Sequence, residues 1–232
     1  MKKLPKIIAV LGPTASGKTS LGILLAKKFN GEVISVDSRQ VYRGMDIGTA
    51  KEKGEWVKEK LMVENIAHWG IDLVDPDQKF NAFDFKQFAE EKIANIIGRG
   101  KVPILVGGTG LYAQALIDNF NFEQEKGSVK YNALQICLSM PREKLYERIN
   151  KRVDEMIDEG LVDEVRGLKE KYGCAIDAMT GIGYRQICRF LDEKAKLDDA
   201  IIEIKKDSRH YAKRQLTWFK RDDRIQWITD SN

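Results

Sequence analysis

Eight consecutive residues near the start of the 232-residue chain have the types and spacing that hold a phosphate group. They match the pattern G-x-x-x-x-G-K-[ST], with an apolar run before them and a helical pattern after them, so a strand, a tight loop and a helix are expected in that order. In such a loop, backbone N–H groups and the helix N-terminus surround the phosphate, the lysine neutralises its oxygens, and the last hydroxyl can bind Mg²⁺. The alternative, a glycine-rich turn with a chance lysine, fits this context less well. The loop consists of Gly12, Pro13, Thr14, Ala15, Ser16, Gly17, Lys18 and Thr19.

A carboxylate follows the second expected strand. The apolar run at 32–36 ends at Asp37, and strand, helix and strand in this order make a βαβ unit of a parallel sheet. A nucleotide-hydrolysing enzyme also needs a strand-end acid to hold Mg²⁺, but the run at 102–106 ends in Gly-Gly-Thr-Gly. Asp37 could therefore be a general base acting on a substrate, or a magnesium ligand through water. It could also simply cap the following turn.

The remaining apolar patterns predict the elements that must position these residues. Helical spacing covers 85–99 and 111–117, and strand-like runs lie at 102–106 and 134–140. We therefore expect an α/β fold, a P-loop NTPase-like parallel sheet flanked by helices, with a C-terminal helical portion. In that portion the sequence predicts helices at 142–158, 161–172 and 199–220 and a last strand at 224–229.

Composition excludes several classes of protein. No run of about 18 apolar residues occurs, and the N-terminal segment reaches Gly and Pro too soon for a signal peptide, so a cytoplasmic chain without a membrane span is expected. The only two histidines, His68 and His210, exclude a His-rich metal centre. The three cysteines, Cys137, Cys174 and Cys188, are odd in number and widely spaced, so the sequence predicts reduced, buried thiols.

Positive charge is concentrated near the C-terminus. The net charge is only +4, but residues 205–221 contain seven Lys or Arg against the single acid Asp207, with aromatic side chains interleaved. This composition favours a phosphate-rich ligand. The stretch could instead be a solvated helix face in which Trp218 and Phe219 are anchored in the core.

Six blocks of sequence resemble one enzyme family. They resemble blocks of the tRNA dimethylallyltransferases, which transfer a five-carbon isoprenoid from dimethylallyl diphosphate to N6 of the adenosine 3′ to the anticodon. The resemblance implies the same reaction here, with dimethylallyl diphosphate and the tRNA anticodon loop as partners. In family order, the blocks are GPTASGKT at 12–19, DSRQVYRGMDIGTAK at 37–51, IDLVDP at 71–76, LVGGTGLY at 105–112, GIGYRQ at 181–186 and YAKRQLTWFKR at 211–221.

The resemblance also implies catalytic roles. In the family the P-loop grips the diphosphate of the donor instead of ATP, which explains a phosphate loop without the usual acid. The aspartate that matches Asp37 accepts a proton from the adenine amine as N6 attacks. The departing diphosphate is stabilised by Thr14, Lys18, Arg214 and Mg²⁺ held at Thr19.

Other matching positions imply contacts with tRNA. Thr109, in the Gly-Gly-Thr-Gly turn, matches a family residue that contacts the target nucleotide, and we count it with the catalytic residues. The turn could also be only a strand-to-helix connection. The residues after Asp37 match a segment around the target base, which must be flipped out of its stack. A salt bridge on the helix surface would explain Arg185 nearly as well as a tRNA contact. The implied tRNA-binding residues are Asp37, Ser38, Arg39, Gln40, Thr109, Arg185 and Gln186.

The chain departs from the family in one respect. Family members usually carry a helical insertion that grips the anticodon stem, and only residues 118–133 stand in its place. We therefore divide the chain into a P-loop α/β core at 1–117, a remnant of the insertion at 118–133, and the rest of the core with the C-terminal helices at 134–232. A monomer is expected.

Other functions fit parts of the pattern. Adenylate dimethylallyltransferases, which act on free adenine nucleotides, share the P-loop and lack the insertion, but GMDIGTAK and AKRQLTWFKR favour the tRNA enzyme. A small-molecule kinase would hold ATP in the P-loop and use Asp37 on an acceptor hydroxyl. A kinase is expected to have an arginine-bearing lid, however, and residues 118–133 contain no arginine. A non-catalytic tRNA-binding protein would have no use for both the P-loop and Asp37.

Overall fold

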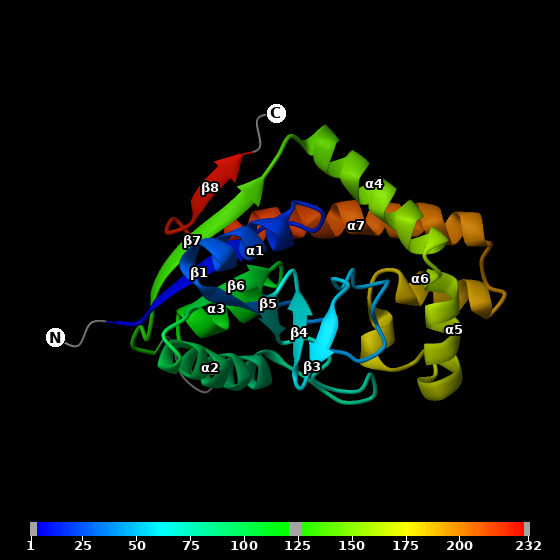
Figure 1. Cartoon of the computed structure of the whole chain (residues 1–232). Helices are drawn as coiled ribbons and strands as arrows, with labels where there is room; N and C mark the ends of the chain where they lie inside the picture. The colour runs from blue at the N-terminus through cyan, green and yellow to red at the C-terminus, as the bar shows by residue number, and fades with distance from the viewer. Residues whose placement is uncertain (1–3, 121–126, 230–232) are drawn as a thin grey trace.

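An eight-stranded sheet organises the chain, for which a computed structural model describes residues 4–120 and 127–229. Over these residues the strand order is β3-β4-β5-β2-β6-β1-β7-β8, and β4 alone runs opposite to the other strands (Figure 1). The carboxyl ends of the central parallel strands therefore meet at one edge of the sheet. The strands are β1 (Lys6–Leu11), β2 (Gly31–Val36), β3 (Glu55–Val57), β4 (Lys60–Val63), β5 (Ile66–Trp69), β6 (Val102–Gly107), β7 (Asn132–Ser139) and β8 (Gln226–Thr229).

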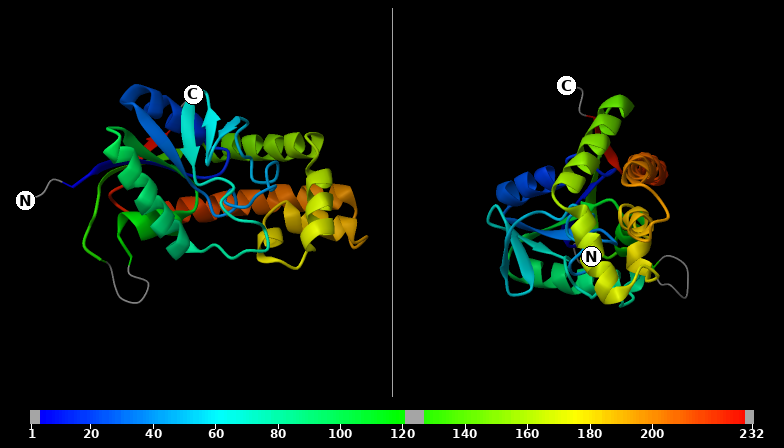
Figure 2. Two further views of the ribbon diagram at one scale, coloured as in Figure 1. Left: turned by 60° about the horizontal axis from the view of Figure 1, so that its bottom comes forward. Right: turned by 90° about the vertical axis from the view of Figure 1, so that its right-hand side faces the viewer.

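Helices cover both faces of the sheet, so the central strands are apolar along their length instead of alternating (Figure 2). On one face Ala26 of α1 packs with Val33 and Ile104. On the other face Phe85 of α2 and Leu116 of α3 belong to a buried cluster with strand residues. The helices are α1 (Lys18–Phe29), α2 (Ala82–Gly98), α3 (Gly110–Ile117), α4 (Arg142–Asp158), α5 (Leu161–Tyr172), a 3₁₀ helix (Asp177–Thr180), α6 (Tyr184–Leu191) and α7 (Leu197–Phe219).

A second buried cluster joins the C-terminal helices to the segment after β2. Val41 from that segment lies in one cluster with Leu161 of α5, Tyr184 of α6 and Ile204 of α7. The long helix α7, orange in Figure 1, then continues to the sheet, where Phe219 belongs to the first cluster. The predicted C-terminal helical portion is thus confirmed, and α7 connects it to the sheet.

The predicted elements are present, with ends shifted by a few residues. The helix predicted at 85–99 is α2, the helix predicted at 199–220 is α7, and the last strand is β8. The sequence did not predict the small sheet segments β3 to β5 or the helix α6, because elements of three to eight residues show little periodicity. Of the segment 118–133, residues 121–126 lie outside the described residues, and the three-part division stays a prediction. Within the described ranges no helix is long and apolar enough to cross a membrane.

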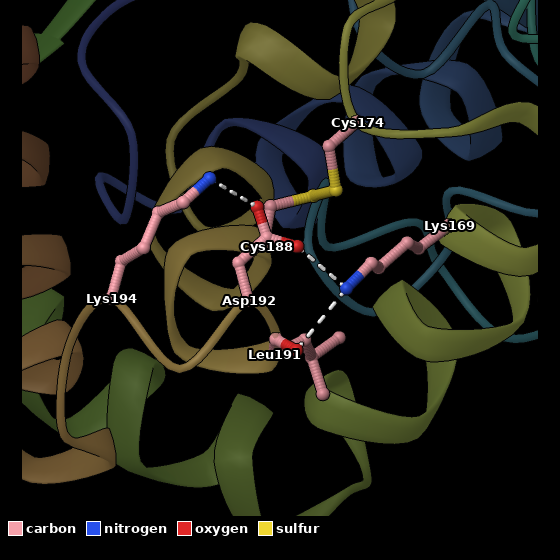
Figure 3. The surroundings of a disulfide bond; sticks show 6 residues. All are labelled: Lys169, Cys174, Cys188, Leu191, Asp192 and Lys194. Carbon is pink, nitrogen blue, oxygen red and sulfur yellow. Dashed lines mark hydrogen bonds and ion pairs between the residues drawn. A yellow bond between two sulfur atoms is a disulfide. The ribbon is translucent and has the colours of Figure 1, made fainter.

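The expectation of reduced thiols is wrong for two of the three cysteines. Cys174, which follows α5, and Cys188 of α6 form a disulfide, with Cα atoms 6.1 Å apart (Figure 3). The chain turns back between them through the 3₁₀ helix, so residues separated by 14 positions come within bonding distance. Lys169 of α5 also pairs with Asp192 at the end of α6 at 2.7 Å, so two links join the same elements. Cys137 of β7 is free and buried, as predicted.

Candidate active site

The loop between β1 and α1 has the backbone conformation of a phosphate cradle. Gly12 has a φ of +142° and Gly17 a φ of +87°, values that L side chains rarely adopt. A Cβ atom at Gly12 would also lie 2.9 Å from the carbonyl O of Leu138 on β7. Ser16 is 5% exposed, and its Oγ has no hydrogen-bond partner in the described part of the chain. A buried hydroxyl without a partner at this position fits an anion bound in the loop.

Lys18 of this loop is partly exposed. Its Nζ donates to the carbonyl O of Pro13 at 2.6 Å, which holds the side chain over the loop. Burial lowers the pKa of Lys18 to about 8, an effect that the negative charge of Asp37 opposes and the positive charge of Arg152 on α4 increases. A bound anion would favour the charged ammonium, so this lysine is suited to bind phosphate.

Asp37 lies directly after β2, at the edge of the sheet where β1 also ends. Its Oδ1 accepts the backbone N–H of Arg39 at 2.8 Å and that of Gln40 at 3.3 Å. The capping of the turn, one of the three interpretations of this residue, is therefore present. Both bonds use the same oxygen, and the carboxylate lines a cavity shared with the P-loop, so capping and chemistry are compatible.

Thr109 joins the turn after β6 to the turn after β2. Its Oγ1 accepts the backbone N–H of Ser38 at 3.0 Å, and it also hydrogen-bonds Tyr211 of α7. Burial raises the pKa of Tyr211 to about 12, and the nearby charge of Asp37 adds to the shift. The guanidinium of Arg214 lies 5.7 Å from the centre of the Tyr211 ring. Two strand-end turns and the basic helix therefore meet at one point.

Lys18, Asp37, Tyr211 and Arg214 line one cavity of about 370 Å³. Thr109 is not part of its wall, but its neighbour Gly108 and its hydrogen-bond partner Ser38 are. One part of its wall is polar and contains the P-loop residues, Asp37 and Arg214. The other part is apolar and comes from α4, α7 and the segment before α6. A wall that contains both polar and apolar side chains suits a ligand with an anionic group and a short hydrocarbon chain. The polar residues include Thr14, Lys18, Thr19, Asp37, Ser38, Arg39, Gln40, Arg152, Tyr211, Arg214 and Gln215, and the apolar ones include Ile149, Val153, Met156, Ile182 and Ile204.

The side chains that follow the strand-end aspartate are bonded within the protein. Arg39 Nη1 donates to the carbonyl O of Asp177 at 3.0 Å. Gln40 Nε2 donates to the carbonyl O of Thr49 at 3.2 Å, and Gln40 Oε1 accepts from Ser35 Oγ at 2.8 Å. Arg39 and Gln40 thus line the cavity as parts of its wall.

Arg185 and Gln186 of α6 converge on one carboxylate. Both donate to Asp207 Oδ2 of α7, Gln186 at 2.8 Å, so the salt bridge considered for Arg185 is present. Gln186 is 1% exposed and also accepts the backbone N–H of Gly183 at 2.9 Å. In this structure the two residues fix α6 against α7, and Arg185 reaches the cavity wall.

Three residues were not predicted from the sequence. Gln215 of α7 accepts the backbone N–H of Thr14 at 2.9 Å and donates to the carbonyl O of Gly108 at 3.0 Å. Arg152 of α4 lines the cavity, and Glu164 of α5 accepts three consecutive backbone N–H groups of the GMDIGTAK block. Gln215 lies inside the block YAKRQLTWFKR, but its residue type carries no signal of this contact. The basic stretch itself is a helix in which Phe219 is buried and Trp218 is 36% exposed.

The relationships of the chain agree with this geometry. The model of the IPP transferase family matches residues 40–130 and 120–222. The chain belongs to the IPP transferase family. It is 39% identical to a tRNA dimethylallyltransferase of Staphylococcus epidermidis, over 97% of this chain and 86% of that protein. It is 37% identical to a tRNA dimethylallyltransferase of Oceanobacillus iheyensis, over 95% of this chain and 90% of that protein.

Solved structures of family members share the fold. The full-length tRNA isopentenylpyrophosphate transferase of Bacillus halodurans matches with a TM-score of 0.88 and 36% identity, over 98% of this chain and 91% of that one. A eukaryotic dimethylallyltransferase acting on tRNA matches with a TM-score of 0.84 and 27% identity, over 97% of this chain and 74% of that one. The alignment with the Staphylococcus protein spans 293 positions, whereas this chain has 232 residues. That relative therefore has residues within the matched span that this chain lacks.

Proposed function

We propose that this protein transfers the dimethylallyl group of dimethylallyl diphosphate to N6 of the adenosine 3′ to the anticodon of tRNA. The observation that carries the proposal is the cavity that Thr14, Lys18 and Thr19 of the P-loop share with Asp37, next to the turn that carries Thr109. A donor held by its diphosphate and an adenine held at the strand-end carboxylate would meet there in reacting geometry. The apolar part of the wall suits a five-carbon chain, and the relatives named above are tRNA dimethylallyltransferases.

The donor side of the reaction uses the P-loop and its basic neighbours. Lys18 and the unpartnered hydroxyl of Ser16 would bind diphosphate oxygens, together with Thr14. Arg214 would offset the negative charge that grows on the departing diphosphate. These are the groups that make diphosphate a better leaving group.

A magnesium ion fits the donor set at this loop. No group of three or more His, Cys, Asp or Glu that could hold a metal occurs in the residues described. Mg²⁺ commonly takes one or two protein oxygens and completes its shell with phosphate oxygens and water, and Thr19 would supply the protein oxygen. When bound, the ion would neutralise part of the diphosphate charge.

The acceptor side uses Asp37 and Thr109. The bond from N6 to the allylic carbon forms as the bond from that carbon to the diphosphate oxygen breaks, and the amine proton passes to the Asp37 carboxylate. Because Oδ1 already accepts two backbone N–H groups, Oδ2 is the oxygen suited to take the proton. Thr109 would contact the target nucleotide and is held in place through Ser38.

Recognition of tRNA requires the target base to leave its stack. Ser38, Arg39 and Gln40 would border the flipped adenosine, and Arg185 and Gln186 would support the wall on the α6 side. Their roles in tRNA binding stay predictions. Since several of these side chains are bonded within the protein, their contribution would come from a preformed pocket.

One assay separates this function from its alternatives. The protein is incubated with labelled dimethylallyl diphosphate, Mg²⁺ and either unmodified tRNA or AMP, and the labelled acceptor is identified. Label in tRNA supports the proposal, and label only in AMP supports the adenylate enzyme. A third arm with ATP and no isoprenoid donor tests for a kinase. Stoichiometric consumption of ATP together with product, or no label in tRNA, would overturn the proposal.

A further inference from the structure

A buried glutamine connects the two loops that hold the two substrates of the proposed reaction. Gln215 of α7 is 6% exposed, and its Oε1 accepts the backbone N–H of Thr14 in the P-loop at 2.9 Å. Its Nε2 donates to the backbone carbonyl O of Gly108, directly before Thr109, at 3.0 Å. One side-chain amide therefore bridges the donor loop and the acceptor turn.

The chemistry of this bridge suits an amide. One end of the side chain faces a backbone donor and the other a backbone acceptor, and the amide of Gln offers both functions on one planar group without a change of charge or tautomer. A carboxylate would place a negative oxygen against the carbonyl of Gly108. The contact is also close, because a Cβ atom at Gly108 would lie 2.1 Å from Gln215 Nε2. A glycine at this position is therefore needed to let the amide approach.

The bridge also determines which amides of the P-loop face the ligand. The backbone N–H of Thr14 has one hydrogen, and Gln215 uses it, so this amide is not part of the anion cradle. The Thr14 side chain still lines the cavity. Gln215 thus acts on the arrangement of the loop and not through a phosphate contact of that amide.

We propose that Gln215 is a positioning residue that couples the P-loop to the turn carrying Thr109. When a diphosphate occupies the P-loop, the bridge fixes the acceptor turn at the distance from the donor that in-line transfer needs. The inference rests on the proposed function for its meaning in catalysis, but the coupling itself is a property of the two loops. It can therefore be measured without any acceptor.

The first experiment measures hydrogen exchange of backbone amides with and without Mg²⁺ and inorganic pyrophosphate. In the unsubstituted protein we expect pyrophosphate to slow exchange in segment 12–19 and also in segment 107–112. In Gln215→Met, which keeps side-chain length and removes both bonds, only segment 12–19 should be protected. Equal protection of both segments in Gln215→Met would overturn the coupling. Protection of segment 12–19 alone in the unsubstituted protein would overturn it as well.

The second experiment compares kinetic constants for prenyl transfer. A misplacement of reacting groups by about 1 Å costs roughly 100-fold in rate, so Gln215→Met should lower kcat by about 10-fold to 100-fold. The Kd for pyrophosphate should change by less than about threefold. Gln215→Glu keeps the acceptor for Thr14 but not the donor for Gly108, and should lower kcat in the same range. An unchanged kcat in both variants would contradict the positioning role.

A matched control separates positioning from loss of stability. Gln135 of β7 is a buried glutamine that hydrogen-bonds Asp222, outside the described cavity wall. Gln135→Met should lower the thermal midpoint about as much as Gln215→Met but leave kcat within about twofold. Similar losses of kcat in both variants would mean that Gln215 acts only through stability. If the unsubstituted protein labels no tRNA, the proposed function fails, and the exchange experiment still decides the coupling.

Discussion

Lys18 and Asp37 illustrate how single residues in this protein combine structural and chemical demands. The surroundings of the lysine disfavour its charge until an anion arrives, and the aspartate caps a turn with one oxygen while its carboxylate faces the cavity. The disfavoured charge of Lys18 lowers the stability of the free protein, and the capping bonds of Asp37 restrict the orientation of its carboxylate. Both effects are common where a site is organised before its ligand binds.

The role of Asp37 can be tested by removing its carboxylate. Asp37→Ala should lower kcat for transfer to tRNA by about 100-fold to 10,000-fold, because a positioned base contributes that much to proton transfer. Donor affinity should stay within about threefold, since the base acts on the acceptor side. Calorimetric titration with the donor provides the check. A collapse of donor affinity would instead identify Asp37 as part of the metal site.

The lowered pKa of Lys18 predicts an unusual pH dependence of stability. The folded pKa is about 8 and the unfolded value is 10.5, so the unfolded state binds more protons between these pH values and stability from this group rises with pH. We expect the free energy of unfolding of the unliganded protein to increase by about 1 kcal/mol from pH 7 to pH 9 through this residue. Urea denaturation at both pH values measures the change.

Lys18→Met is the matched control, because it keeps the length of the side chain and removes the titrating amine. The part of the pH-dependent gain that comes from Lys18 should disappear in this variant. Pyrophosphate binding to the unsubstituted protein should weaken as pH rises through about 8, where the ammonium loses its charge. If both proteins gained stability equally between pH 7 and pH 9, the Lys18 amine would not be the source of the gain.

At the scale of elements, the disulfide ties α6 to the end of α5, next to the segment that borders the cavity. A bond closing a loop of about 15 residues stabilises a fold by roughly 3 kcal/mol. Reduction with dithiothreitol should therefore lower the free energy of unfolding by about 2 to 3 kcal/mol. Cys174→Ser should show the lower stability in both conditions and no response to the reductant. A response of the same size in Cys174→Ser would show that another group is affected.

The sequence predicted elements and residues whose signals are local. The P-loop pattern and Asp37 both follow apolar runs, and strands that are parallel end at the same edge, so their proximity could be expected. The bridge from Thr14 to Gln215 spans 201 positions, and its physical cause is the path of α7 across the sheet. The disulfide likewise depends on how the chain turns between two helices. Contacts of this kind have no periodicity or spacing that a single sequence displays.

At the scale of the whole molecule, the absence of residues that a longer relative carries should change how tRNA is held. We expect those additional residues to contribute phosphate contacts, and each such contact steepens the dependence of binding on salt. We expect the slope of log K against log[salt] to be smaller for this protein than for the Staphylococcus epidermidis relative. Filter binding of the same tRNA at several salt concentrations measures both slopes. An equal or steeper slope would show that the contacts are replaced elsewhere.

The exposed basic face of α7 is where such replacement contacts would lie. Neutralising Lys213 and Arg214 together should weaken tRNA binding further and lower the slope by about one to two units. Arg214 also lines the cavity, so donor binding is measured in the same variant, and Lys213→Gln alone serves as the control for the tRNA contact. Unchanged tRNA affinity in the double variant would exclude this face of α7 as a site of tRNA contact.

The path of the chain through the site also sets the order in which the enzyme can become active during its synthesis. Gln215, the amide partner of Thr14, leaves the ribosome 201 positions after it, which at 5 to 20 residues per second is a delay of roughly 10 to 40 seconds. β1 likewise lies between β6 and β7, two strands made long after it. A nascent chain can therefore display the phosphate loop while the acceptor turn is still unconnected to it. The coupled site therefore forms only after α7 has been synthesised.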